Sequence, residues 1–207
     1  MPDCDFRLGL ITDRLLCSEP LTERTTRIIR AGAGRIILRE KDLSEPELLT
    51  LALKIKTASD KTKGQLIINS SLTVAMEVRS FGLHLPFTRL KESGCQVLSP
   101  EYPDLSVSVS VHSLAEALAA QKAGASQVLA GPIFPTASKP GHPGTGIKFI
   151  CLLKSNLSIP VWAVGGLKPD NIKEVIKAGA ETIFIRGPLM KEPDPEGYIQ
   201  KCLKEIS

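Results

Sequence analysis

The chain alternates between short apolar segments and longer helical segments along its whole length. The short segments have the length and residue types of buried strands, and the longer ones repeat apolar residues at helical spacing. Strands are predicted at about residues 7–12, 34–39, 65–69, 81–85, 106–111, 126–130, 160–164 and 181–186. Helices are predicted near residues 21–31, 44–58, 71–80, 113–123, 146–155, 169–178 and 195–206. Strands this apolar belong in a parallel sheet covered by helices.

Three of these units share a signature in which a helix ends in Ala-Gly-Ala directly before a strand, at residues 30–34, 122–125 and 177–180. The glycine can close the helix in the left-handed conformation, and the alanines let the helix end lie against the sheet. Eight strand–helix units predict an α/β fold of the (β/α)8 barrel type, with a doubly wound open sheet as the alternative. The length of 207 residues fits one barrel, so we expect a single domain over residues 1–207.

Two connections differ from the rest. Residues 86–103 are the hardest to assign and are predicted to hold only a short helix near residues 88–93. Residues 131–146, which we call the lid, contain four glycines and four prolines in sixteen positions. Proline fixes φ and glycine permits close backbone approach, so the lid is predicted to be a shaped cover over a ligand. It carries Ser138, Lys139 and His142, the last of which we interpret as a solvent-exposed loop residue.

Charged residues follow the second predicted strand, at the end where barrels place their chemistry. Alternation directs Arg39 and Lys41 to one side and Glu40 to the other. Two cations at the barrel mouth suit an anionic ligand. The alternative is a surface ion pair with Asp42 or Glu45.

Histidines stand at the ends of two other strands. Ser110 and His112 alternate onto one face at the end of the fifth predicted strand. His112 would face the mouth, where an imidazole with an ordinary pKa of about 6.5 can both take and give a proton. The alternative is a hydrogen-bonded structural histidine. His84, after the fourth predicted strand, has apolar neighbours, so packing and ligand contact fit its position equally well.

The last two predicted strands end in residues suited to phosphate. Gly165 and Gly166 follow the seventh strand, and Arg186 ends the eighth. Barrels often bind phosphate at this point with backbone N–H groups, which glycine allows to approach the anion. A tight turn is the alternative explanation for the glycine pair.

Four segments occur in an order that matches a known family: residues 38–41 (Leu-Arg-Glu-Lys), 110–113 (Ser-Val-His-Ser), 131–139 (Gly-Pro-Ile-Phe-Pro-Thr-Ala-Ser-Lys) and 163–166 (Ala-Val-Gly-Gly). With them the chain resembles the thiamine-phosphate synthase superfamily, including its thiazole tautomerase branch, over nearly its whole length. The resemblance implies a (β/α)8 barrel in thiamin biosynthesis.

The two branches of this superfamily differ in the acidic residues that would bind Mg²⁺. Synthases resembling this chain carry glutamine on the second strand, Asn-Asp after the third and an acidic residue after the fourth. Here Ile37 takes the glutamine position, Asn69 is followed by two serines, and residues 84–90 contain no acid. Mg²⁺ would lack those protein anchors. The resemblance therefore favours the tautomerase branch, which isomerises a carboxythiazole phosphate to the aromatic thiazole without a metal or organic cofactor.

The resemblance implies a role for each of these residues. His112 would shuttle the proton. Arg39 and Lys41 would bind the carboxylate end of the substrate or stabilise the charge that develops on it, and Lys139 would approach the substrate from the lid. Phosphate would be held by the glycine pair and by Arg186, where the family usually has serine. Further substrate-binding residues would be Asn69, His84, Ser110, Thr136 and Ser138. One alternative is a thiamine-phosphate synthase that recruits Mg²⁺ differently, through Asp13 or Asp42; another is a non-catalytic protein that binds or senses thiamin intermediates.

The composition of the chain argues against nucleic-acid binding, a zinc site and a membrane-spanning segment. The net charge of +4 comes from scattered lysines and arginines, and aromatic residues make up 4% of the chain. This fits a small anionic ligand, the phosphorylated thiazole, better than a nucleic acid. Five cysteines without a C-x-x-C pair indicate reduced thiols and no zinc site, and no apolar run is long enough to span a membrane. We expect a cytoplasmic protein, and a homodimer is one expectation because related barrels often dimerise.

Overall fold

Eight apolar strands lie side by side in chain order, and the last one closes the sheet on the first. All eight pairings are parallel in the computed structural model, which describes residues 4–92 and 104–207. The strands are β1 (Asp5–Ile11), β2 (Ala33–Leu38), β3 (Gln65–Asn69), β4 (Gly82–Pro86), β5 (Ser106–Val111), β6 (Gln127–Ala130), β7 (Val161–Val164) and β8 (Thr182–Ile185). The predicted barrel is confirmed, and the open sheet is excluded.

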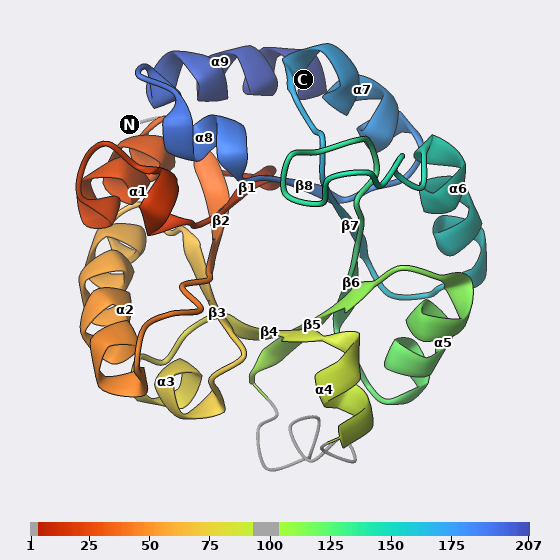
Figure 1. The fold of residues 1–207 in the computed structure, drawn as a ribbon, viewed down its shortest axis with the longest axis horizontal. Coiled ribbons are helices and arrows are strands. Elements are labelled where there is room, and N and C mark those ends of the chain that lie inside the picture. The colour runs from red at the N-terminus through yellow and green to blue at the C-terminus, as the bar shows by residue number, and fades with distance from the viewer. Residues whose placement is uncertain (1–3, 93–103) are drawn as a thin grey trace.

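Helices surround the barrel on all sides (Figure 1). They are α1 (Leu21–Arg30), α2 (Glu45–Asp60), α3 (Leu72–Glu77), α4 (Phe87–Glu92), α5 (Leu114–Lys122), α6 (Ile147–Asn156), α7 (Pro169–Lys177), α8 (Gly187–Lys191) and α9 (Pro195–Ile206), with a 3-10 turn η1 (Arg14–Leu16). The short helix predicted near residues 88–93 is α4, and its predicted last residue lies outside the described residues. The three glycines expected to close helices, Gly32, Gly124 and Gly179, all have positive φ.

Two apolar clusters build the molecule. The larger one lies between the strands and the helices. The smaller one fills the barrel interior with inward-facing residues of six strands: Ile11, Ile37, Ile67, Leu129, Trp162 and Phe184. Its two aromatic rings pack with centroids 5.3 Å apart. Because side chains fill the interior, a ligand must bind at one end of the barrel and not inside it.

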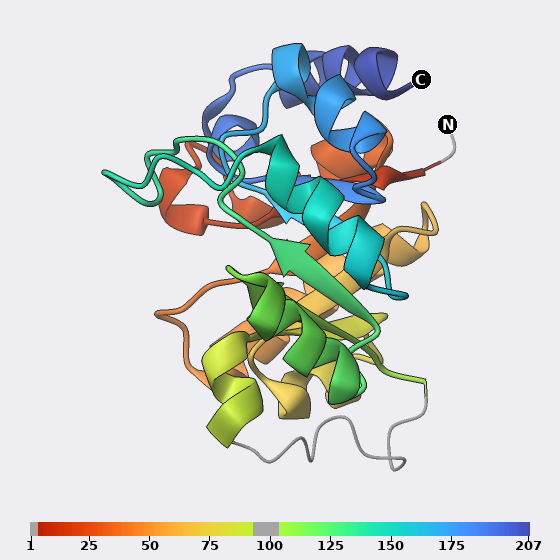
Figure 2. The same ribbon diagram turned by 90° about the vertical axis from the view of Figure 1, so that its right-hand side faces the viewer.

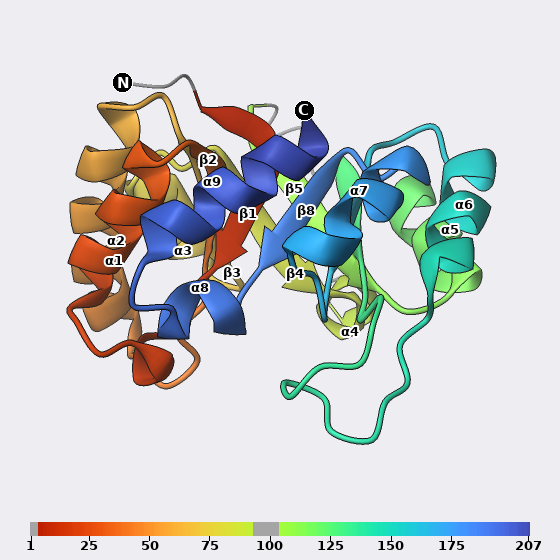
Figure 3. The ribbon, with the colours of Figure 1, turned by 90° about the horizontal axis from the view of Figure 1, so that it is seen from above.

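The two ends of the barrel differ. The lid and α8 lie at the end where the strands finish, and both chain termini lie toward the other end (Figures 2 and 3). Figure 2 shows the lid projecting well beyond the strands. None of the helices in residues 4–92 and 104–207 is long and apolar enough to cross a membrane.

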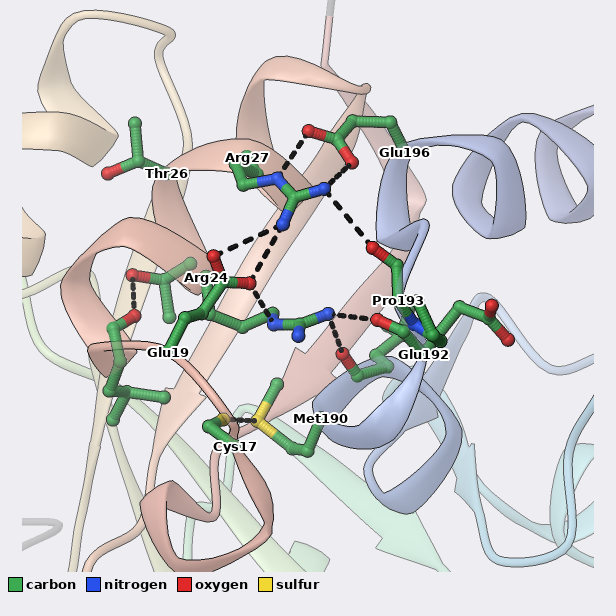
Figure 4. A network of polar contacts seen from close by, with 12 residues as sticks. Cys17, Glu19, Arg24, Thr26, Arg27, Met190, Glu192, Pro193 and Glu196 are labelled. Carbon is green, nitrogen blue, oxygen red and sulfur yellow. Dashed lines mark hydrogen bonds and ion pairs between the residues drawn. The ribbon is translucent and has the colours of Figure 1, made fainter.

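The elements η1 and α8 were missed by the sequence analysis because three and five residues are too few to show a helical period. A charged network fixes α8 to its neighbours (Figure 4). The buried Arg24 of α1 lies 2.6 Å from Glu19 and also donates to the backbone oxygen of Glu192. Arg27 bridges Glu19 and Glu196. Removing the counter-charge of a buried guanidinium costs about 3–5 kcal/mol, so this network anchors the segment that follows β8.

Candidate functional site

His112 directly follows β5, at the mouth of the barrel. Its backbone N–H donates to Glu116 Oε2 at 2.7 Å, and its ring Nδ1 makes a short hydrogen bond with the backbone carbonyl of Gly131. A carbonyl only accepts, so Nδ1 carries the hydrogen and the neutral ring keeps its lone pair on Nε2. Lys139 Nζ of the lid lies 3.4 Å from Nε2. The ring is therefore held in one tautomer with its basic nitrogen facing the lid.

The base of the lid is fixed to the end of β7. Ile133 N donates to Val164 O and Phe134 N to Gly165 O, both at 3.0 Å. The two halves of the base are joined where Gly146 N donates to Ile133 O at 2.9 Å. The lid tip, by contrast, is exposed. Because the base of the lid is fixed by hydrogen bonds and its tip is exposed, Lys139 can reach the barrel mouth while the lid base stays in place.

Gly165 and Gly166 form the turn between β7 and α7 with φ of +98° and +66°. A Cβ on Gly165 would lie 2.5 Å from Pro132 Cβ, and one on Gly166 would lie 2.6 Å from Phe134 Cβ. The turn thus needs glycine for the close approach of the lid. Within the described ranges, the N–H groups of both glycines have no protein acceptor. Those N–H groups remain available to an anion, and phosphate binding there stays a prediction.

His84 of β4 lies inside the barrel and is only 4% exposed. Its Nδ1 and Nε2 each lie 2.8 Å from a serine hydroxyl, Ser108 and Ser110 respectively. Burial, with a smaller effect of the Arg39 charge, lowers the pKa of His84 to about 4. The ring is neutral at pH 7 with both nitrogens engaged, so it is suited to ordering Ser110 rather than to shuttling protons. Direct ligand contact by His84 stays a prediction.

This buried histidine predicts a specific pH dependence of stability. The unfolded chain takes up a proton on His84 as the pH falls below 6.5, whereas the folded chain does so only near pH 4. The contribution of His84 to the free energy of unfolding is therefore fully present above pH 6.5. About 3 kcal/mol of it is lost as the pH falls from 6.5 to about 4. Urea unfolding at several pH values should show that slope, and His84→Gln should flatten it. An unchanged slope in the variant would assign the pH dependence to other groups.

The cations after β2 lie in different surroundings. Arg39 is half-buried, and its backbone N–H donates to Thr12 Oγ1 at 2.9 Å. Lys41 is exposed. Glu40 turns toward β1, where its carboxylate accepts hydrogen bonds from Thr12 Oγ1 at 2.6 Å and from the backbone of Arg14. Burial raises the pKa of Glu40, although those hydrogen bonds oppose the shift. Ligand binding by Arg39 and Lys41, and the convergence of their charges, therefore stay predictions.

Arg186 pairs with Asp13, which follows β1. Its Nε donates to Asp13 Oδ2 at 3.1 Å, and its Nη2 makes a second short contact with the same oxygen. Arg14 likewise pairs with Asp42 at 2.6 Å. Both carboxylates that the Mg²⁺ alternative proposes as ligands are therefore engaged by guanidinium groups. No cluster of three or more histidine, cysteine or acidic side chains suited to a metal occurs in residues 4–92 and 104–207.

Three other predicted binding residues make local contacts. Asn69 Nδ2 donates to Ser70 Oγ at 3.0 Å. In the lid, the backbone oxygen of Thr136 accepts from Lys139 N at 3.1 Å, and Thr136 Oγ1 accepts from Ser138 N at 3.4 Å. Ligand binding by Asn69, Thr136 and Ser138 stays a prediction.

Sequence reasoning missed one polar residue of this region, Ser108, and the partners of two others, Asp13 and Glu40. Ser108 was signalled by the alternating serines of β5, which bring it to the same face as Ser110. Asp13 and Glu40 follow β1 and β2, but their partners Arg186 and Thr12 follow other strands, β8 and β1 respectively. Identifying them required the side-chain directions of the closed barrel.

A hollow of about 570 Å³ lies at the opposite end of the barrel. There the Arg35 guanidinium stacks on the rings of Phe6 and Trp162, with 5.5 and 5.0 Å to their centroids. It also donates to Gln65 Oε1 at 2.8 Å and to Thr182 Oγ1. These contacts close the floor of the barrel, and none involves a residue at the mouth.

The family model described as "Thiamine monophosphate synthase" matches residues 8–188. The chain belongs to this family. The thiamine-phosphate synthase of Syntrophomonas wolfei is 31% identical over 208 residues, covering 100% of this chain and 98% of the relative. The "Thiamine-phosphate synthase 2" of Streptococcus pneumoniae is 33% identical over 203 residues, covering 97% and 95%. Family membership makes this chain an enzyme of thiamine biosynthesis.

A solved structure agrees with this assignment. The thiamine phosphate pyrophosphorylase from Pyrococcus furiosus superposes with a TM-score of 0.83 and 27% identity, covering 97% of this chain and 95% of that one. The resemblance to the superfamily is confirmed. The names of these relatives, however, favour the synthase alternative over the tautomerase branch, so the reaction itself must be argued from the residues.

Proposed function

We propose that the protein aromatises a carboxythiazole phosphate by proton transfer through His112, without a metal or organic cofactor. The observation that carries the proposal is the single tautomer of His112. Its Nδ1 is occupied by the Gly131 carbonyl, so Nε2 is the only ring nitrogen that can exchange a proton with a ligand.

The proposed reaction moves one proton and changes no oxidation state. His112 Nε2 removes the ring proton beside the sulfur, and the resulting electron pair shifts toward the exocyclic carbon. The imidazolium then returns the proton to that carbon, so one residue acts first as base and then as acid. Lys139, 3.4 Å from Nε2, brings a positive charge beside the negative charge that develops on the ligand.

The residues at the mouth fit a bridging Mg²⁺ poorly. Mg²⁺ in phosphate chemistry is usually held by one or two carboxylates. Asp13 and Asp42 are both paired with arginines, and the buried Glu40 accepts hydrogen bonds from Thr12 Oγ1 and from the backbone of Arg14. The proposed reaction therefore includes no metal-dependent step.

The second candidate is the synthase reaction, which joins hydroxymethylpyrimidine diphosphate to thiazole phosphate. The names of the relatives favour it. It would require Arg14 or Arg186 to release an aspartate so that Mg²⁺ could bind.

A chelator experiment separates the two candidates. Purified protein should convert the exocyclic-alkene isomer of carboxythiazole phosphate to the aromatic form at the same rate with and without EDTA, because the proposed proton transfer uses no metal. Product can be followed by chromatography. With pyrimidine diphosphate, thiazole phosphate and Mg²⁺, no more thiamine phosphate than in a protein-free control is expected. EDTA-sensitive thiamine phosphate formation without isomerisation would establish the synthase reaction, and binding of thiazole phosphate without either turnover would indicate a non-catalytic protein.

A further inference from the structure

Helices α2 and α5 begin with the same sequence pattern, Ser-x-x-Glu, at residues 44–47 and 113–116. This pattern is typical of a capping box, in which the glutamate accepts a hydrogen bond from the backbone N–H of the serine. The first turn of α2 has that arrangement, since Ser44 N donates to Glu47 Oε2 at 2.9 Å. Glu47 therefore supports the start of its own helix.

The glutamate of α5 accepts from a different residue. Ser113 Oγ accepts from the backbone N–H of Glu116 at 3.2 Å, as a capping serine does. Glu116 Oε2, however, accepts from the backbone N–H of His112 at 2.7 Å, one residue before the serine. The carboxylate thus supports the residue that carries the proposed base.

This hydrogen bond gives His112 a second point of support. The ring is held at Nδ1 by the carbonyl of Gly131, which directly follows β6. The backbone is held by Glu116, which belongs to α5. Only the side-chain torsions χ1 and χ2 lie between these points, so fixing both points limits where Nε2 can lie. A carboxylate acceptor also makes the backbone bond stronger than one between neutral groups.

We infer that Glu116 is a positioning residue for His112. It acts through the backbone N–H, so it takes no part in the proton transfer itself. Its effect on catalysis rests on the proposed function, because Nε2 is the nitrogen that would exchange a proton with the ligand. Proton transfer requires the base within about 3 Å of the reacting atom, and a small displacement lowers the rate. Loss of Glu116 therefore slows the reaction without removing a group that binds the ligand.

Steady-state kinetics on the exocyclic-alkene substrate test this inference. Glu116→Ala should lower kcat by roughly 5- to 50-fold, because the backbone of His112 loses its acceptor. KM should change by less than about threefold, because the proposed anion-binding groups stay in place. Glu116→Gln keeps an oxygen that accepts the same N–H, so it should hold kcat within about threefold of the parent. An equal loss in both variants would assign the effect to the charge and overturn the positioning role.

Glu47→Ala and Ser113→Ala are the matched controls, since each removes a capping contact at the start of a helix. Both should lower the urea midpoint of unfolding, as Glu116→Ala should. Both should nevertheless leave kcat within about twofold, because neither removes the acceptor of the His112 N–H. If kcat fell in step with the urea midpoint in all three variants, the effect of Glu116 would be one of stability alone and the inference would fail.

A spectrum of the His112 ring separates this inference from the proposed function. In a two-bond ¹H–¹⁵N spectrum, Glu116→Ala should shift or broaden the ring resonances of His112, whereas Glu116→Gln should keep them as in the parent. Unchanged resonances in Glu116→Ala would overturn the positioning role. If the resonances change but the parent does not isomerise carboxythiazole phosphate, the positioning role stands and the proposed function fails. If the parent isomerises it and Glu116→Ala keeps the parent kcat, the function stands and the positioning role fails.

Discussion

Replacing His112 with asparagine is expected to lower kcat for isomerisation by about 10²- to 10⁴-fold, the usual contribution of a positioned acid–base group. Asparagine can still donate from Nδ2 toward the Gly131 carbonyl, so the backbone there should be little disturbed. It offers no titratable nitrogen in the position of Nε2. KM should change by less than about threefold, because the substitution removes proton transfer and leaves the proposed anion-binding groups in place. Steady-state kinetics on the exocyclic-alkene substrate measure both quantities.

His142→Asn is the matched control for this substitution. His142 is the exposed histidine of the lid tip, and its Nδ1 accepts from the backbone N–H of Gly144 at 3.0 Å. An asparagine there should leave kcat within about twofold. A parent-like kcat in His112→Asn would assign the base to another residue. A raised KM with unchanged kcat would make His112 a binding residue instead.

The barrel and the positions of its strand-end residues could be predicted because they depend on local patterns. Apolar strands and helices alternate clearly, and a barrel places every strand end at one mouth. His112 could therefore be located from the end of β5 alone. The lid was also visible, since its glycines and prolines exclude a regular helix or strand.

The partners of the charged residues could not be predicted because they depend on closure of the barrel. Asp13 and Arg186 are separated by 173 residues, and they meet only because β8 pairs with β1. Glu40 and Thr12 likewise meet only because β1 pairs with β2. Sequence reasoning directed Arg186 to the phosphate, whereas the structure turns it toward Asp13.

Family membership and reaction depend on different residues of this chain. The match over residues 8–188 covers most of the barrel and the whole lid. The reaction depends on the few groups at the mouth, where Asn69 is followed by serine and the nearby aspartates are held by arginines. The proposed proton transfer therefore rests on the residues at the mouth and not on the names of the relatives.

The turn that supports the lid leads to the second large expected effect. Gly166→Ala should lower the free energy of unfolding by about 2–4 kcal/mol, from the strain of a non-glycine residue at φ +66° and from overpacking. The added Cβ would lie 2.6 Å from both Phe134 Cβ and Pro135 O, so the lid base must shift. That shift would move Lys139 away from His112 and disturb the free N–H groups of the turn. We expect kcat/KM to fall by roughly 10- to 100-fold.

Gly141→Ala separates backbone strain from the contact with the lid base. Gly141 has φ of +78°, but a Cβ there would meet nothing within 4 Å. It should cost only about 1–2 kcal/mol and leave kcat/KM within about threefold. Urea unfolding and steady-state kinetics on both variants measure the difference. Equal effects of the two substitutions would mean that positive φ alone accounts for them, and that the lid does not depend on close packing against the β7 turn.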